Sequence, residues 1–201
     1  MTVTLIDYGA GNVTSVARAL RRLGAEVRLT NKPQEASSAA SIILPGVGHC
    51  AALLNSLDAH ALRQPLLDAI ARGTPFLGIC LGLQALYQRS EEAPDIPGLG
   101  VFSGEVALLP QNVKLPHMGW NQMQAVHPCR LLDGISPDAY FYFAHSYAAR
   151  AGGSETAATC IHGREFTAVL ECNRVFGVQF HPEKSGTAGA KLLENFLKAA
   201  A

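Results

Sequence analysis

The sequence predicts an α/β fold in which helices flank a central, mostly parallel sheet and the second half adds an antiparallel part. In the first half, short apolar runs of strand length alternate with stretches of helical periodicity. In the second half, strand candidates follow one another with little helix between them. Continuously apolar strands that alternate with helices are typical of parallel strands covered on both faces. The parallel part is therefore expected from the first half.

Strands and helices alternate up to residue 80. A β-rich run over residues 3–8 precedes a stretch over 12–24 with apolar residues at positions 13, 16, 17, 20 and 23. This is the spacing of an amphipathic helix that ends at Gly24. Further strands are expected over residues 26–30, 41–46 and 74–80, and a helix over residues 65–73.

Closely spaced strand candidates occupy the second half. They cover residues 100–109, 140–147, 155–163, 166–171 and 175–180. A final helix is expected over residues 187–200, because apolar residues stand at 192, 193, 196 and 197 behind the possible caps Ser185 and Thr187. No internal repeat or linker interrupts the chain, so one domain over residues 1–201 is expected.

The composition indicates a globular protein and argues against several partners. Of 201 residues, 48% are hydrophobic, which suffices for one sizeable core. The 16 basic and 16 acidic residues balance, and without a run of Lys or Arg neither nucleic acid nor a membrane surface is expected as a partner. The start does not resemble a signal peptide and no apolar run approaches membrane-spanning length, so a soluble, cytoplasmic protein is expected.

The cysteines and the first glycine-rich turn indicate neither a metal nor a cofactor. The five cysteines are odd in number and lack the C-x-x-C pairs of a zinc site. The turn "YGAGNVTS" follows a strand, but Thr14 stands where a dinucleotide-binding turn has its third glycine, and no acidic residue ends the second strand. A tight turn with Asn12 as helix cap is the favoured interpretation.

Cys80 lies in "GICLG", which has the form of a nucleophile between two glycines where a strand gives way to a helix. Small flanking residues permit the sharp, strained turn that lifts a side chain clear of a sheet. The N-terminus of the following helix favours a thiolate through its partial positive charge. A packed core thiol remains the alternative for such a cysteine.

The segment "VFGVQFHPEKSG" offers a base for this nucleophile. If the strand continues through it, His181 and Glu183 project on the same side, with Pro182 fixing φ between them. Together with Cys80 they have the composition of a nucleophile, base and orienting carboxylate. A surface turn is the alternative for an isolated His-Pro-Glu.

A second glycine-rich loop, "LPGVGH", follows the third strand. Its backbone N–H groups are candidates for an oxyanion hole, together with the N–H of Leu81 directly after the nucleophile. A simple turn between strand and helix is the alternative. His49 is expected to be a loop residue.

The motifs "PGVGH", "GICLGLQ" and "FHPEKS" stand in the order expected of a class I glutamine amidotransferase domain, and the resemblance covers nearly the whole chain. Within that class, "DYGAGN", "PHMGWN", "YFYFAHSY" and the segment over residues 90–100 resemble the glutaminase subunits of imidazole glycerol phosphate synthases. The resemblance implies a three-layer fold and hydrolysis of L-glutamine without a cofactor.

The resemblance also implies roles for individual residues. Cys80, His181 and Glu183 would form a triad that makes a γ-glutamyl thioester. The positions similar to those that hold glutamine or complete the oxyanion hole are Gly46, Val47, Gly48, Leu81, Gln84, Ser146 and Tyr147. The ammonia would pass to a (β/α)8 barrel cyclase in a heterodimer that serves histidine biosynthesis. The positions similar to that interface are Asn12, Trp120, Asn121, Tyr142 and Lys184. Ser15 departs from an asparagine found in the family.

Three alternatives stay open at this point. Amidotransferase subunits for anthranilate or pyridoxal phosphate synthesis share the triad and are expected to lack "PHMGWN". A cysteine-elbow hydrolase or chaperone-like protein of similar fold needs neither Glu183 nor a partner. A binding module with an inactive site requires a missing triad member, and none is missing.

Overall fold

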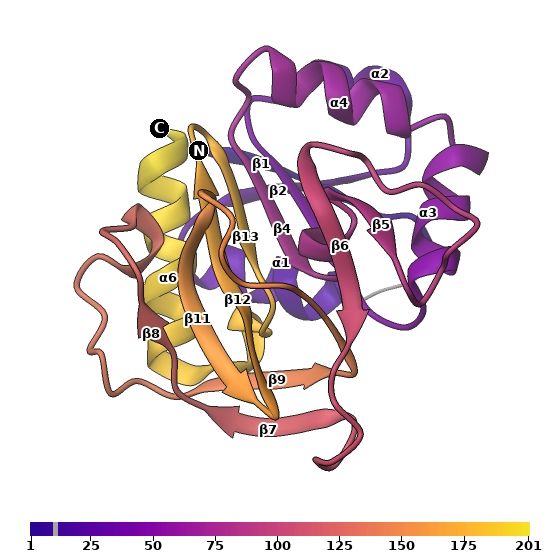
Figure 1. The fold of residues 1–201 in the computed structure, drawn as a ribbon. Coiled ribbons are helices and arrows are strands. Elements are labelled where there is room, and N and C mark those ends of the chain that lie inside the picture. Colours follow the sequence, from indigo (N-terminus) through magenta and orange to yellow (C-terminus); the bar gives the residue numbers. More distant parts are fainter. Residues whose placement is uncertain (10–11) are drawn as a thin grey trace.

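The computed structural model describes residues 1–9 and 12–201; residues 10 and 11, in the glycine-rich turn examined above for dinucleotide binding, lie outside the described residues (Figure 1). The strands are β1 (Thr2–Ile6), β2 (Glu26–Thr30), β3 (Ile42–Gly46), β4 (Phe76–Cys80), β5 (Tyr87–Ser90), β6 (Phe102–Leu108), β7 (His117–Asn121), β8 (Gln124–Ala125), β9 (Phe141–His145), β10 (Tyr147–Ala149), β11 (Thr156–His162), β12 (Arg164–Cys172) and β13 (Val175–Val178). The helices are α1 (Val13–Arg22), α2 (Pro33–Ser37), α3 (Cys50–Ala59), α4 (Arg63–Ala71), α5 (Leu81–Gln84) and α6 (Gly186–Ala200).

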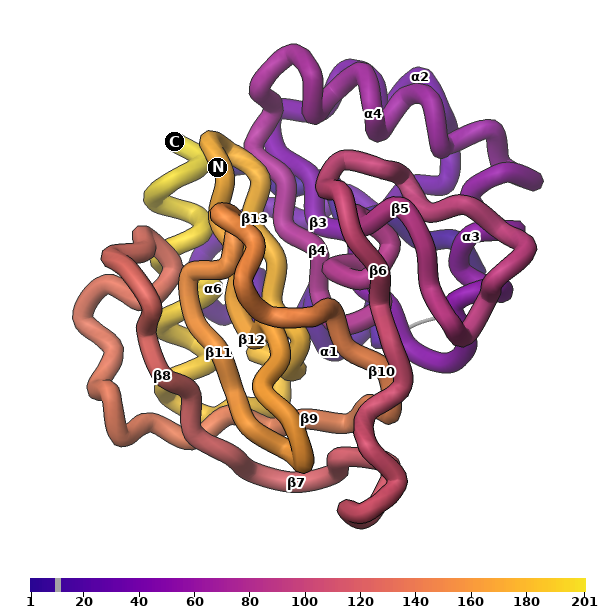
Figure 2. The backbone as a smooth tube through the Cα atoms, viewed as in Figure 1, coloured from indigo at the N-terminus to yellow at the C-terminus, as the bar shows by residue number. Residues whose placement is uncertain are grey.

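The main sheet has the strand order β2-β1-β3-β4-β13-β12-β11-β8. β1 to β4 and β13 run parallel to their neighbours within this group, whereas β12, β11 and β8 continue the sheet with antiparallel pairings. Figure 2 shows β13, near the end of the chain, beside β4 from its first half. The predicted α/β fold with an antiparallel part is confirmed, and the parallel part includes one strand from the second half.

Helices cover both faces of this sheet and give the molecule three layers. α1 and α6 lie on one face, and α2, α3 and α4 lie on the other (Figure 1). Alternate residues of each strand serve the two cores: Ile43 belongs to the core under α1 and α6, while Ile42 and Leu44 belong to the core under α3 and α4. Both faces are therefore apolar, as the continuous hydrophobic runs require.

Two small sheets complete the fold. β10, β6 and β5 form one, and the antiparallel pair of β7 and β9 forms the other. The strand expected over residues 140–147 therefore divides at Ser146, because β9 and β10 join different sheets. The sequence pattern predicts no strand at β5 or β7. In β5 the two ends are buried and the middle is exposed, so no alternation marks it; β7 does alternate, with Met118 and Trp120 more exposed than their neighbours, but it holds few apolar residues.

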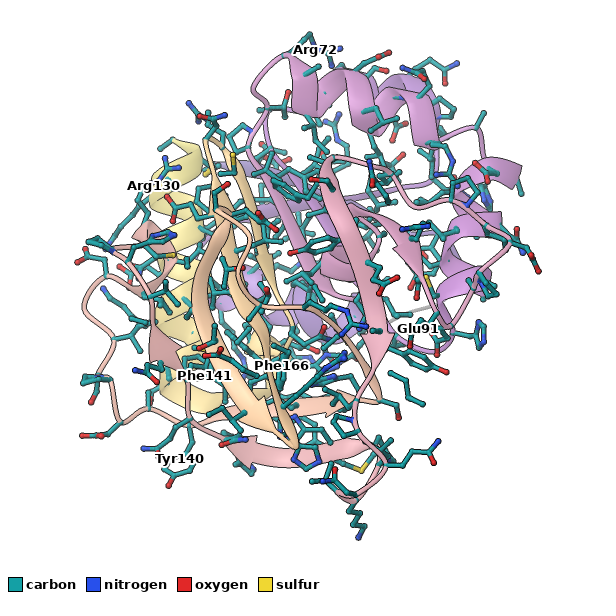
Figure 3. The ribbon with its side chains drawn as sticks, viewed as in Figure 1. Arg72, Glu91, Arg130, Tyr140, Phe141 and Phe166 are labelled. Carbon is teal, nitrogen blue, oxygen red and sulfur yellow. The ribbon has the colours of Figure 1, made fainter. Side chains whose placement is uncertain are left out.

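Aromatic rings join the β7–β9 sheet to the main one. The ring centroids of Phe141 and Phe180 lie 4.3 Å apart, and those of Phe143 and Phe166 lie 5.9 Å apart. Figure 3 shows Tyr140 at the periphery of the molecule and Phe141 and Phe166 farther inside. This packing fixes the backbone just before His181, since Phe180 is fully buried. No helix in the described part of the chain is long and apolar enough to cross a membrane.

Candidate functional site

Cys80 occupies the sharp turn that the sequence predicts. β4 ends at this residue with φ 54° and ψ −107°, and α5 begins at the next. A Cβ atom on Gly78 would lie 2.5 Å from the Gly82 carbonyl oxygen, and one on Gly82 would lie 1.9 Å from the Leu44 carbonyl oxygen. A non-glycine residue at positive φ costs on the order of 1–3 kcal/mol, so this turn stores strain at the cysteine.

The helix after Cys80 is short. α5 contains only four residues. A helix dipole grows from aligned peptide units, so one turn provides a weak field. Any preference for a thiolate at Cys80 must therefore come from individual neighbouring groups.

His181 and Glu183 meet, but not in the way the sequence predicted. β13 ends at Val178, and residues Pro182–Lys184 form a 3-10 turn instead of a continued strand. The turn nevertheless places His181 Nδ1 3.0 Å from Glu183 Oε1. The side chains are 4% and 0% exposed. The interpretation as a continued strand is wrong, because Pro182 starts a 3-10 turn; His181 itself is extended at the cap position, with φ −101° and ψ 96°, and the turn folds the Glu183 side chain back toward it.

Hydrogen bonds fasten this turn to β9. The His181 N–H donates to the Tyr142 carbonyl oxygen at 2.8 Å. Ser185 Oγ donates to the His181 carbonyl oxygen at 2.7 Å and accepts from the Tyr142 N–H at 3.0 Å. Ser185 stands at the cap position of α6, but its side chain makes no cap hydrogen bond because it is used here.

The surroundings of His181 favour its charged form. Burial lowers its pKa, but hydrogen bonds with Cys80 and Glu183 outweigh burial and raise the pKa to about 10. Burial opposes ionisation of Glu183, yet the hydrogen bond from His181 outweighs it and lowers the pKa of that carboxyl. Asn12 Nδ2 also donates to Glu183 Oε1, at 2.9 Å. An imidazolium facing a carboxylate results.

Cys80 and His181 line a cavity of about 220 Å³. The other predicted site residues that line it are Val47, Gly48, Leu81, Gln84, Ser146, Tyr147 and Lys184. Gly46 packs behind the wall, since a Cβ atom there would lie 2.5 Å from Leu81 Cβ. Glu183 reaches the cavity only through His181.

Glu92, Ala144 and His145 also line the cavity and were missed. Glu92 Oε2 accepts a hydrogen bond from the Cys50 N–H at 2.8 Å, which anchors the carboxylate at the start of α3. An acidic residue in a polar turn has no periodicity that shows where it points. Its only sequence signal was its place in the segment over residues 90–100 that carries the family resemblance.

The predicted oxyanion peptide is engaged elsewhere. The Val47 N–H donates to Tyr8 Oη at 3.4 Å. Burial raises the pKa of Tyr8 to about 12, so its hydroxyl is neutral at pH 7. Gly48 has φ +93° with open space where a Cβ would stand, which permits backbone rotation. His49 is the cap residue of α3, and its Nδ1 accepts from the Ala51 N–H at 3.1 Å.

Two further histidines, His117 and His145, lie at the cavity, and His145 forms part of its lining. His117 Nδ1 and His145 Nε2 lie 3.2 Å apart, across neighbouring positions of β7 and β9. His145 Nδ1 lies 2.9 Å from the Tyr147 carbonyl oxygen, which can only accept. His145 therefore carries its proton on Nδ1, and His117 donates to its Nε2. Asn121 Nδ2 contacts the remaining nitrogen of His117 at 3.3 Å.

The predicted interface residues separate into two groups. Trp120 is 55% exposed, its ring lies 6.0 Å from that of Tyr142, and Lys184 Nζ lies 5.6 Å from the Tyr142 ring centre. These residues form one surface beside the cavity, and Asn121 extends it along β7 through a hydrogen bond to the Ile161 carbonyl oxygen. Asn12 instead lies behind the triad against Glu183.

A larger hollow of about 490 Å³ lies beside α6 and includes Cys129 and Arg130. Burial and then Glu171 raise the pKa of Cys129 to about 12, so this thiol is protonated at neutral pH. The neighbour of the Cys129 thiol is the Glu171 carboxylate, which is paired with Arg130, whereas the neighbour of Cys80 is the protonated His181 ring. Among the described residues, no group of three or more His, Cys, Asp or Glu side chains could hold a metal ion.

The chain is similar to known proteins over nearly its whole length. The family model for glutamine amidotransferase class I matches residues 4–200. The imidazole glycerol phosphate synthase subunit HisH of Methanothermobacter thermautotrophicus is 44% identical over 196 residues, 98% of either chain. The same subunit of Deinococcus radiodurans is 44% identical over 198 residues, 96% of this chain and 92% of the relative.

Two solved structures share the fold. A crystal structure described as a glutamine amidotransferase superposes with a TM-score of 0.79 at 19% identity, covering 98% of each chain. PurLQS from Thermotoga maritima superposes with a TM-score of 0.77 at 20% identity, covering 98% of this chain and 97% of the other.

Proposed function

The chain belongs to the class I glutamine amidotransferase family, and from this membership we propose that it hydrolyses L-glutamine as the glutaminase subunit of an imidazole glycerol phosphate synthase. The observation that carries the proposal is the meeting of Cys80, His181 and Glu183 at one cavity. The HisH relatives, at 41–45% identity over nearly their whole length, favour this synthase over those that make anthranilate or pyridoxal phosphate.

The reaction follows from the charged pair. Cys80 Sγ, as a thiolate, attacks the side-chain carbonyl carbon of glutamine, and a C–S bond forms as negative charge develops on the oxygen. Protonated His181 gives its proton to the amide nitrogen, the C–N bond breaks, and ammonia leaves. Neutral His181 then takes a proton from water, which attacks the thioester carbon. The C–S bond breaks and glutamate is released. Glu183 stabilises the imidazolium through both halves of the cycle.

The cavity has groups that suit the substrate. Glu92 supplies an anionic group for the α-ammonium of glutamine. Gln84 Oε1 is buried without a hydrogen-bond partner among the described residues, so it is available to accept from a substrate N–H. Leu81 begins α5, where the N–H groups of the first turn have no carbonyl partner inside the helix, and it offers one oxyanion donor.

The surface at β7 and β9 suits a protein partner. Met118 and Trp120 on β7 and Ile161 on β11 are 65%, 55% and 66% exposed. Met118 and Trp120 are two residues apart on one strand and so project from the same face, and exposed large apolar side chains grouped in this way are typical of an interaction surface. Lys184 contributes to this surface and also lines the cavity, so a cyclase docked here would stand next to the point where ammonia is released. We infer a heterodimer with a barrel-shaped cyclase.

The test is to purify the chain with the cyclase encoded in its own source and to measure glutamate release and imidazole glycerol phosphate formation. We expect Cys80→Ala to abolish glutamine-dependent synthesis while synthesis from added ammonium salt persists, because only the ammonia source is lost. Cys172→Ala, at an exposed cysteine, is the control. Glutamine-dependent activity in Cys80→Ala would contradict the nucleophile assignment.

A further inference from the structure

A run of buried amides leads to the sulfur of Cys80. Gln179 follows β13, is fully buried, and its Nε2 lies 3.6 Å from Cys80 Sγ. Its Oε1 accepts from Gln84 Nε2 at 3.1 Å. Gln84 Nε2 also donates to the Tyr147 carbonyl oxygen at 2.8 Å. The mechanism described above assigns no role to Gln179.

The direction of each amide in this run is determined by the one before it. The Tyr147 carbonyl can only accept, so the Gln84 atom that faces it is the NH2 group. That same nitrogen faces Gln179, so the Gln179 atom in contact must be its oxygen. The Gln179 NH2 group is thereby turned toward Cys80. If the Gln179 amide were reversed, two NH2 groups would face each other and a carbonyl oxygen would face the sulfur.

We propose that Gln179 is a further catalytic residue, whose N–H donates to the Cys80 thiolate, and that Gln84 and the Tyr147 carbonyl position its amide for this contact. A donor favours the charged acceptor over the neutral one, so the bond stabilises thiolate over thiol. This deepens the proposed function, because the thiolate is both the attacking group and the group that leaves when the thioester is hydrolysed.

Because the helix after Cys80 is short, few groups other than this donor are available to stabilise the thiolate. Four residues in α5 provide a weak dipole, and Cys80 is only 3% exposed, so water contributes little to stabilising a charge on its sulfur. His181 supplies the opposite charge on one side. Gln179 supplies a directed donor from the residue directly after β13, the strand that pairs in parallel with β4.

The experiment measures the pH dependence of Cys80 alkylation by iodoacetamide in the full chain alone. The thiolate forms a C–S bond and expels iodide, so the rate follows the thiolate fraction. Peptide mass spectrometry separates Cys80 from exposed Cys172, which serves as internal standard. For Gln179→Met, which keeps an unbranched chain but no donor, we expect the alkylation midpoint to rise by about one pH unit and the rate below it to fall about tenfold.

A second variant tests the positioning of the amide. Gln84→Met leaves Gln179 intact but frees its amide, so the midpoint should move the same way. The double variant should shift no further than Gln179→Met, because both substitutions remove one interaction. Gln64→Met, at an exposed position of α4, is the matched control.

Two results would overturn the proposal. One is an unchanged midpoint in a folded Gln179→Met chain, or in Gln84→Met if the first variant does not fold. The other is a double variant whose shift equals the sum of the single shifts, since the two residues would then act separately. No glutamine or cyclase enters the assay, so a shift seen in a chain that releases no glutamate even with the cyclase and its ligand would reject the proposed function and leave the contact between Gln179 and the Cys80 thiolate standing.

Discussion

His181 and His145 line the same cavity and are 3% and 6% exposed, yet the protein stabilises the protonated form of His181 and the neutral form of His145. His181 faces a carboxylate and a thiol, and its pKa is raised to about 10. His145 faces a carbonyl and the neutral ring of His117, and burial first and then repulsion from a protonated His117 lower its pKa to about 3, so both rings stay neutral at pH 7. Burial alone therefore does not decide the charge of a histidine. The hydrogen-bond partner does, because only an anion offsets the loss of hydration.

The difference between the two histidines depends most directly on the carboxylate beside His181. Glu183→Gln keeps a hydrogen-bond acceptor for Nδ1 but cannot stabilise the cation, so we expect kcat for glutamine hydrolysis to fall by up to about four orders of magnitude. The pKa of His181, followed by NMR of labelled imidazole, should fall as well. Glu105→Gln, at a surface ion pair with Arg150, is the control. A Glu183→Gln enzyme as active as the parent would show that Glu183 merely sits in a turn.

Stimulation by the partner is expected to act on the oxyanion donor and not on the histidines. The His181–Glu183 pair is already formed in the chain alone, whereas the Val47 N–H is directed to Tyr8. We therefore expect the isolated chain to bind glutamine but hydrolyse it slowly. The cyclase with its nucleotide ligand should raise kcat by about 100 to 1,000-fold, the effect of gaining one oxyanion donor.

Steady-state kinetics of the chain alone, with the cyclase, and with cyclase and ligand measure this effect. An isolated chain as fast as the loaded complex would disprove gating. A change confined to KM would show that the partner shapes glutamine binding and that the Val47 peptide is not the switch. A shifted pH profile for kcat would show that the partner acts on His181.

The neutral state of His117 and His145 can be tested through the free energy of unfolding at mildly acid pH. Burial and then the charge of His162 lower the pKa of His117 to about 4, while an unfolded histidine titrates near 6.5. As pH falls below about 6.5, His117 and His145 become protonated in the unfolded chain but stay neutral in the folded chain. The unfolded chain therefore binds more protons, and the free energy of unfolding falls. His181, with its raised pKa, loses its contribution as pH rises from about 6.5 toward 10. Maximum stability is therefore expected near pH 6.5.

Urea unfolding between pH 5 and 6.5 measures this loss, since most carboxylates stay ionised there. The free energy of unfolding should fall by up to about 1.4 kcal/mol per pH unit for each histidine. His117→Phe should make the slope shallower, and His127→Gln, in the loop after β8, should leave it unchanged. A slope near zero for the parent chain would show that the pair accepts protons in the folded state.

Local chemistry in the sequence predicted most strands of the main sheet, the helices α1, α4 and α6, and the turn at Cys80, but not β5, β7, β8, α2 or α3. Apolar runs and periodicity follow from what each segment must bury, and the glycines around Cys80 follow from contacts within a few residues. The segments that carry Cys80, His181 and the Gly46–Val47 peptide could each be selected for the same reason. Their catalytic roles stay predictions.

Only the tertiary structure decided how these segments meet. Apolar parallel strands fit beside one another in many orders, so nothing in residues 76–80 or 175–178 shows that they pair. The pairing brings His181 to Cys80 across about half the chain, and the β7–β9 register brings His117 to His145. The contacts of Glu92 and Gln179 and the 3-10 turn at Pro182 could not be predicted from the sequence pattern for the same reason. Their positions depend on which distant backbone atoms accept and donate hydrogen bonds, and local periodicity carries no record of those partners.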